Sequence, residues 1–109
     1  MKCRKLGNTR LEVSEIALGC EAFVENNENA KLFLDRAEEA GINYFDLFSP
    51  DPNARDALGI AMEGRRDKFI IQSHISSVWK NGQYERSRNI DDVKVAFEDS
   101  LTRRFSDFN

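Results

Sequence analysis

Apolar residues occur in this chain in two alternating patterns. Short continuous runs appear in "EIALGC" at 15–20, "NYFDLF" at 43–48 and "KFIIQS" at 68–73. Between the first two runs, apolar residues recur three and four positions apart, at Ala30, Phe33, Leu34 and Ala37. A short apolar run predicts a buried strand, and the wider spacing predicts a helix with one apolar face. The pattern therefore predicts strands and helices in alternation.

The ends of the predicted helices carry their own signals. The first helix should stop at Gly41, because glycine tolerates the left-handed conformation that follows a helix. The second should begin at Pro52, with Asp51 as its N-cap, and end at Gly64. The third should begin near Asn89. The apolar faces of the second and third helices are Ala54, Ala57, Leu58, Ala61 and Met62, and Ile90, Val93, Phe97 and Leu101.

Two segments fall outside this alternation. "CRKLGNTRLEVS", at 3–14, has a turn signal between apolar positions and predicts a β-hairpin. "SSVWKNGQYERSRN", at 76–89, is polar and predicts a loop that is long for a strand-to-helix connection, and such loops are often functional. Alternating strands and helices imply a parallel sheet. We therefore expect one α/β domain over 1–109, with a hairpin at 3–14 and βα units at about 15–41, 43–64 and 68–105.

The composition limits which binding partners and which cellular compartment we expect for this protein. The 109 residues carry a net charge of −3, which argues against a nucleic-acid partner. No apolar run approaches the ~18 residues of a membrane span, and the basic start of the chain is not followed by the apolar part of a signal peptide. We expect a cytoplasmic protein with Cys3 and Cys20 as reduced thiols. A disulfide between them is the alternative.

Four ordered segments resemble the aldo/keto reductase family. "RKLGNTRLEVSEIALG" is similar to the family's N-terminal hairpin and first barrel strand, and "AEEAGINYFD" to its second strand. "LGIAMEGRRDKFIIQS" resembles the segment that leads into the third strand, and "VKVAFEDSLTRRFSDF" the helix before the fourth. "FDLFSPDP" and "QSHISSVWKNGQYERSR" resemble a divergent bacterial branch that often carries a C-terminal ferredoxin-like iron–sulfur segment. The resemblance implies a TIM-type (β/α)8 barrel, of which this chain would form the hairpin and the first three βα units, an incomplete and truncated barrel.

The resemblance also implies a chemistry. Family members reduce a small-molecule carbonyl with NADPH, using an Asp at the end of the second strand, a Tyr five residues later, a Lys at the end of the third strand and a His at the end of the fourth. Asp46 matches the family Asp, but Asp51 stands at the Tyr position and His74 at the Lys position. The family binds NADPH mainly through the last two βα units, so the binding region is absent from this chain and no cofactor-binding residue is assigned.

Asp46 and His74 are therefore the candidate catalytic residues. They should lie close together, because barrel sites form at the carboxyl ends of adjacent strands. Each could instead be a hydrogen-bonded strand-end residue without a catalytic role. A metal site made of Asp46, Asp51 and His74 is a further alternative. Trp79 and Tyr84 are expected to anchor the loop at 76–89, with contact to substrate as their alternative role.

Two functions follow from these observations. The first is an N-terminal fragment of an aldo/keto reductase-type oxidoreductase, inactive on its own because the family Tyr and Lys are replaced. The alternative is a non-catalytic α/β binding or assembly module derived from that fold. In either case, three strands of an eight-stranded barrel leave two unpaired sheet edges, so we expect a homo-oligomer.

Overall fold

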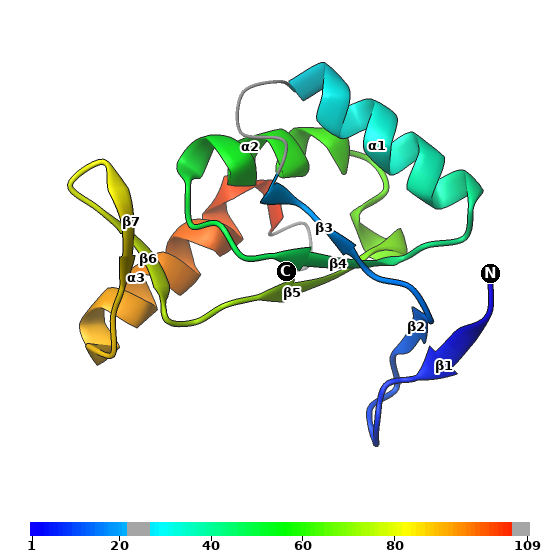
Figure 1. Cartoon of the computed structure of the whole chain (residues 1–109), viewed down its shortest axis with the longest axis horizontal. Helices are drawn as coiled ribbons and strands as arrows, with labels where there is room; N and C mark the ends of the chain where they lie inside the picture. Colours follow the sequence, from blue (N-terminus) through cyan, green and yellow to red (C-terminus); the bar gives the residue numbers. More distant parts are fainter. Residues whose placement is uncertain (22–26, 106–109) are drawn as a thin grey trace.

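The centre of the protein is a small parallel sheet, seen in a computed structural model that describes residues 1–21 and 27–105. Its three strands lie in the order β3 (Leu18–Gly19), β4 (Tyr44–Leu47) and β5 (Ile70–Ser73). Helices α1 (Asn27–Glu39) and α2 (Pro52–Ala61) connect the strands and cover one face of the sheet (Figure 1). The expected parallel α/β arrangement is confirmed, and the described residues form no closed barrel.

Two antiparallel hairpins flank the sheet at opposite ends (Figure 1). The predicted N-terminal hairpin is formed by β1 (Cys3–Lys5) and β2 (Glu12–Ser14) and lies near the start of the sheet strands. Asn43 ties it to the sheet, since its side chain accepts from the backbone N–H of Ser14 at 2.8 Å and donates to the carbonyl oxygen of Glu12 at 2.9 Å.

The second hairpin corrects the sequence prediction for 76–89, because the expected loop is folded into two strands. These are β6 (Ser77–Lys80) and β7 (Gln83–Arg86). The turn between them places Asn81 at φ 55° and Gly82 at φ 74°. Positive φ at both central residues defines the type I′ turn, which Asn-Gly favours and which matches the twist of paired strands. The polar composition of the segment hid this signal.

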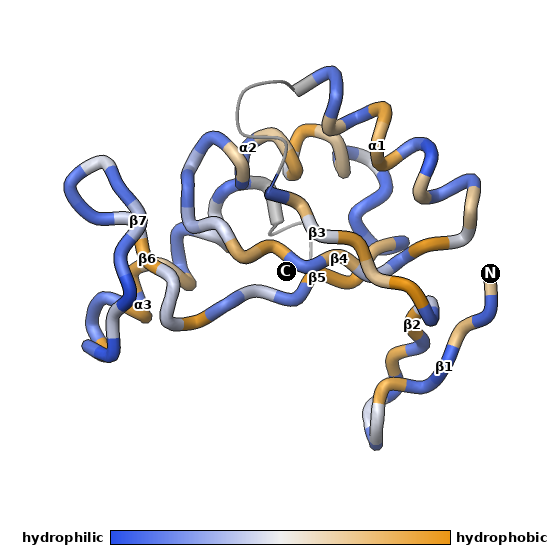
Figure 2. Tube along the Cα trace, in the orientation of Figure 1, coloured by the Kyte–Doolittle hydropathy of each residue, from blue (hydrophilic) through white to orange (hydrophobic). Residues whose placement is uncertain are grey.

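The core lies between the sheet and the two helices. Phe45 and Leu47 point from β4 toward the helices, and the ring of Phe45 meets that of Phe69 edge to face, with centroids 5.3 Å apart. Figure 2 shows hydrophobic stretches in both β4 and α2, and their buried residues belong to one cluster. The expected buried face of α2 is confirmed in full. The core residues are Cys20, Ala30, Leu34, Ala37, Phe45, Leu47, Ala57, Leu58, Ala61, Met62 and Phe69.

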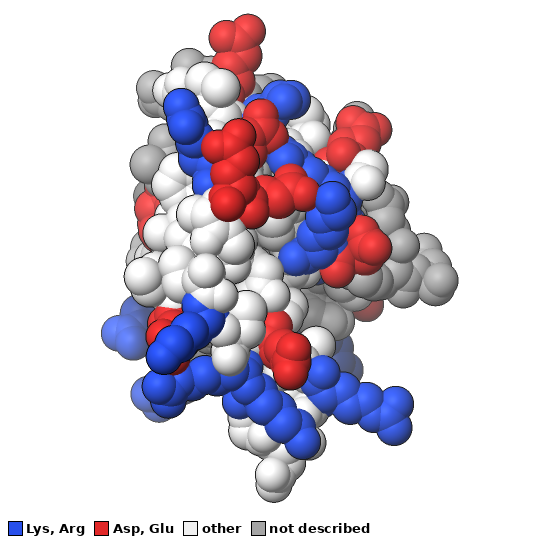
Figure 3. Space-filling model, turned by 90° about the vertical axis from the view of Figure 1, so that its right-hand side faces the viewer, with Lys and Arg blue, Asp and Glu red and all other residues white. Residues whose placement is uncertain are grey.

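Charged side chains are divided between two regions of the face shown in Figure 3. Lys and Arg gather around the N-terminal hairpin, at the lower end of the view, and acidic side chains gather over α1. Near α1, Arg65 Nη1 lies 2.7 Å from Asp35 Oδ1 and 2.8 Å from Glu38 Oε2, and Lys68 pairs with the other Glu38 oxygen. These ion pairs join α1 to the turns that follow α2, including the short helix η2 (Arg66–Lys68).

The third helix, α3 (Ile90–Ser100), begins where the sequence predicts, with Asn89 accepting from two backbone N–H groups of its first turn. It continues into η3 (Leu101–Phe105). Its apolar face is largely uncovered, with Ile90 67%, Phe97 57% and Leu101 42% exposed. The sheet in the described part of the chain ends at β5, so no further strand of this sheet covers the exposed part of the face, and α3 contacts β6 of the second hairpin instead. None of the described helices has the length and apolar character needed to cross a membrane.

Candidate functional site

The strand ends bring Asp46 and His74 together. Side chains alternate between the two faces of a strand, so Phe45 and Leu47 enter the core while Asp46 faces away from the helices. His74 follows β5 directly. Its Nε2 lies 2.8 Å from Asp46 Oδ1, which confirms the predicted proximity. An ionised carboxylate only accepts hydrogen bonds, so the tautomer of His74 with a proton on Nε2 is the one that can donate to an ionised Asp46.

Two further residues extend this pair into a row of polar side chains. Gln72, the neighbour of Asp46 in the sheet register, donates from Nε2 to Asp46 Oδ1 at 3.2 Å. The hydroxyl of Tyr44 donates to Gln72 Oε1 at 2.6 Å. No motif in the sequence predicts Tyr44 or Gln72 as a site residue. Their signal was the period of two along each strand, which places Tyr44 on the face of Asp46 and Gln72 on that of His74.

Asp51 is separate from this row. Its carboxylate accepts from the backbone N–H of Asn53 at 2.8 Å and caps α2, with Pro52 as the first helical residue. The predicted N-cap role is thus confirmed. The metal-site alternative is wrong for the part of the chain that the structure describes, since no group of three His, Cys, Asp or Glu side chains there is placed to hold an ion.

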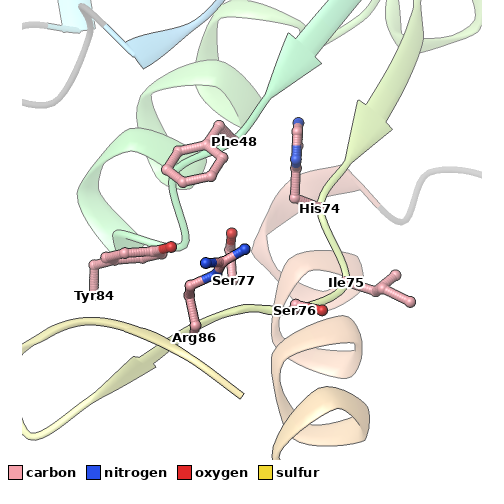
Figure 4. A pocket seen from close by; sticks show the side chains of 7 residues that line it. All are labelled: Phe48, His74, Ile75, Ser76, Ser77, Tyr84 and Arg86. Atoms are coloured by element: carbon pink, nitrogen blue, oxygen red, sulfur yellow. The ribbon is translucent and has the colours of Figure 1, made fainter. Parts of the chain in front are cut away.

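An aromatic wall stands beside the Asp46–His74 pair. The ring of Phe48 lies 5.1 Å from that of His74, edge to face, and 5.4 Å from that of Tyr84 on the second hairpin. These rings border a cavity of about 500 Å³, and Figure 4 shows Tyr84 and Arg86 reaching into it from β7. The residues that line it are Phe48, His74, Ile75, Ser76, Ser77, Tyr84 and Arg86. Trp79, opposite Tyr84 in the hairpin, lines a different cavity against α3.

The backbone of Cys20 lies behind the site, where its N–H donates to the carbonyl oxygen of Asp46 at 3.0 Å. Its side chain is fully buried in the core, whereas Cys3 is exposed, and both cysteines are free. Burial raises the pKa of the Cys20 thiol to about 12, with smaller contributions from the Glu21 and Asp46 carboxylates. The thiol is therefore protonated at neutral pH, and a protonated thiol is a poor nucleophile.

The end of β3 at Gly19 does not fit the diphosphate of a nicotinamide dinucleotide. Such groups are held by glycine-rich turns with free backbone N–H groups. At Gly19, which ends β3, a Cβ atom would lie 2.8 Å from Glu21 Oε2, so the open side of this glycine faces a carboxylate. The other oxygen of Glu21 accepts from the N–H of Phe48 at 3.3 Å. A negative charge at this point repels a phosphate.

Comparisons with known proteins give relatives that are much longer than this chain. No protein-family model matches it. It is 32% identical over 114 residues to the uncharacterized oxidoreductase YqkF of Bacillus subtilis (strain 168), and 29% identical over 125 residues to the protein tas of Escherichia coli (strain K12). Each match covers 99% of this chain but only 37% and 36% of the relative, so the chain spans little more than a third of their length.

Solved structures also match nearly the whole of this chain, and they too are longer than it. The putative aldo-keto reductase PA4992 from Pseudomonas aeruginosa superposes with a TM-score of 0.81 at 28% identity, over 94% of this chain and 42% of that one. The holo form of the aldo-keto reductase AKR11C1 from Bacillus halodurans gives a TM-score of 0.82 at 30% identity, over 95% of this chain and 36% of that one. The fold of the described residues is thus found inside larger proteins.

Proposed function

The chain matches aldo-keto reductases over nearly its whole length, as an N-terminal fragment of their fold, and from this premise we propose that it forms the first three βα units of an oxidoreductase barrel. Residues 1–109 then act as one domain, with the hairpin at 3–14 and βα units at about 15–41, 43–64 and 68–105. In a barrel of this type the reacting groups stand at the carboxyl ends of the strands.

The Asp46–His74 pair is the observation that carries this proposal. It stands at the strand ends, and His74 holds the position that the family resemblance gives to a Lys. An imidazolium here would keep a cation against the Asp46 carboxylate, as the family Lys does. The substrate of the whole protein is then a small carbonyl compound.

Residues 1–109 should nevertheless be inactive by themselves. The family Tyr, which donates the proton, is replaced by Asp51, and the carboxylate of Asp51 is engaged with the first turn of α2. An ionised carboxylate has no proton to donate. NADPH supplies the hydride in the family, and the resemblance places its binding mainly in the last two βα units, so no residue of this chain is assigned to it.

We also propose that the protein forms a homo-oligomer and that it is cytoplasmic. A second copy of the chain would cover the edges of β3 and β5 that have no neighbouring strand among the described residues. The net charge of −3 supports neither a nucleic-acid nor a membrane partner. Free Cys3 on the surface is in keeping with the reducing cytoplasm.

A non-catalytic binding module is the second candidate function. It is favoured by the replacement of both the Tyr and the Lys, together with the presence of a cavity beside His74. The two functions predict different results when the family Tyr and Lys are put back. A fragment of an oxidoreductase should then support turnover, whereas a binding module that has lost the barrel chemistry for other reasons should not.

A chimera separates the two functions. Residues 1–109 replace the matched part of the holo aldo-keto reductase from Bacillus halodurans, and NADPH consumption with a reactive aldehyde is followed at the nicotinamide absorbance band. We expect background turnover for the chimera, and for residues 1–109 alone, and clear turnover once Asp51→Tyr and His74→Lys are introduced together. A folded double variant that stays at background favours the binding module. Turnover by residues 1–109 alone, lost in Asp46→Asn but kept in the surface control Asp67→Asn, contradicts the expected inactivity.

A further inference from the structure

The second hairpin places two side chains over the strand ends. Tyr84 and Arg86 are two positions apart on β7, so they point to the same side of that strand. Figure 4 shows both on the side that faces Phe48. The hairpin is therefore more than a connection between β5 and α3, because it forms one wall of the cavity beside His74.

This cavity adjoins a second one of different character. The first is bordered by the rings of Phe48, His74 and Tyr84. The second has a volume of about 390 Å³ and is lined by Ser76, Arg86, Ser87 and Arg88. Ser76 and Arg86 belong to both cavities. An aromatic compartment thus opens beside a basic, hydroxyl-bearing one, and no residue that lines either of them is acidic.

Arg86 and Arg88 differ from several other arginines of the described residues in their ion pairs. Arg55, Arg65 and Arg103 each lie within 3.2 Å of a carboxylate oxygen. By contrast, across residues 1–21 and 27–105, no ion pair includes Arg86 or Arg88.

Two carboxylates of neighbouring elements, Asp92 and Asp46, already have partners of their own. Asp92 accepts from the hydroxyl of Ser87 at 2.8 Å and pairs with Lys80 at 3.2 Å, while Asp46 is held by His74. Two guanidinium groups at the edge of a cavity, without a carboxylate partner of their own, are suited to an anion from outside.

We infer that the paired cavities bind a small organic anion, with its planar apolar body against Phe48 and Tyr84 and its carboxylate or phosphate against Arg86. Guanidinium groups bind both anions through two parallel hydrogen bonds. Aromatic rings pack well against a planar body, and cavities of 300–1,000 Å³ are the usual size for small ligands. The inference rests on the proposed function for its place at the barrel mouth, and it adds a substrate class, a carbonyl compound that carries an anionic group.

Binding to the unmodified chain gives the first test. Isothermal titration compares phenylacetate and phenyl phosphate with phenylacetamide, which has nearly the same shape as phenylacetate but no charge, and with inorganic phosphate, which lacks the apolar body. We expect one or both organic anions to bind at least about tenfold more tightly than the amide and inorganic phosphate. The stronger of the two identifies the anionic group. Equal affinity for the acid and the amide, or no binding of either organic anion at millimolar concentration, overturns the inference.

Variants give the second test. Arg86→Ala should weaken binding of the preferred anion at least about tenfold, and Arg86→Lys should recover part of the loss because it keeps the charge without the paired donors. Arg10→Ala, which removes an exposed arginine from the N-terminal hairpin, should leave binding unchanged. An equal effect of Arg86→Ala and Arg10→Ala would show attraction by overall charge and refute the site. No cofactor or turnover enters either test, so a failure of the proposed function and a failure of this site are seen separately.

Discussion

At the scale of single residues, the carboxylates of Asp46 and Asp51 lie close together in the sequence but make different kinds of contact. Asp46 interrupts an apolar strand, and its partners Gln72 and His74 come from the neighbouring strand. Asp51 lies five residues further and bonds only two residues ahead, to Asn53. The contacts of Asp46 join neighbouring strand ends, which is where barrel sites form. The contact of Asp51 lies within one helical turn and is that of a helix cap. The two carboxylates therefore have different consequences when removed.

Removal of the cap should cost stability. Asp51→Ala leaves a backbone N–H of the first turn of α2 without its acceptor, so we expect the free energy of unfolding to fall by about 1 kcal/mol. Asp51→Ser should keep most of it, since serine also caps helices. Urea unfolding followed by circular dichroism measures both, with the exposed Asp67→Ala as the control. If Asp51→Ala unfolds at the same urea concentration as that control, the cap contributes nothing.

At the scale of elements, one arginine connects the two helices that cover the sheet. Arg65 binds Asp35 and Glu38 of α1 through Nη1, and its Nε and Nη2 donate to the carbonyl oxygen of Ala61 at the end of α2. Its guanidinium also lies 5.7 Å from the centre of the Phe69 ring. The packing of α1 against α2 thus depends on a charge as well as on the apolar stripes.

This connection should weaken in acid. Hydrogen bonds from Lys31 and then Arg65 lower the pKa of Asp35, and hydrogen bonds from Lys68 and then Arg65 lower the pKa of Glu38. A carboxyl whose pKa is lower in the folded state stabilises that state above its unfolded pKa, near 4, and loses the contribution as the pH falls through the folded value.

The corresponding measurement is urea unfolding between about pH 3 and pH 7. We expect stability to fall below about pH 4, and Arg65→Met to lower stability at neutral pH and flatten this dependence. Arg36→Met is the matched control, because Arg36 is exposed on α1 and lies 3.7 Å from Glu39. Equal pH profiles for the two variants would show that Arg65 does not couple to these carboxylates.

At the scale of the whole molecule, the described part of the chain leaves apolar and backbone groups uncovered. The outer edges of β3 and β5 have no neighbouring strand among the described residues. The apolar face of α3 is exposed, with Phe97 as its largest side chain. Exposed edges and apolar faces favour association, and a second copy of the chain can cover both.

We therefore expect residues 1–109 to self-associate. Sedimentation equilibrium over a wide concentration range should show species of at least twice the 12.5 kDa mass of one chain. Phe97→Glu should shift the equilibrium toward the monomer, because it places a charge in the apolar contact. Leu32→Glu, on the exposed side of α1, should not. A single 12.5 kDa species at every concentration would contradict the expectation.

The sequence by itself determined the features that depend on neighbours along the chain. The N-cap at Asp51, the left-handed Gly41 and the apolar stripe of α2 were all predicted, because each follows from hydrogen bonds or spacing within a few residues. The adjacency of Asp46 and His74 was also predicted, since parallel strands bring their ends to one edge. The second hairpin differs from the prediction, because the polar composition of the segment indicates a loop although its Asn-Gly turn is a local signal for a hairpin.

Only the tertiary structure decided what the cavity contains and what stays exposed. The approach of Phe48 to both His74 and Tyr84, and the place of Arg86 in the wall, depend on how the second hairpin leans over the strand ends. The exposure of Phe97 depends on which elements stand opposite α3. These are contacts between segments far apart in sequence. Their geometry is set by the packing of whole elements, and no periodicity along the chain records it.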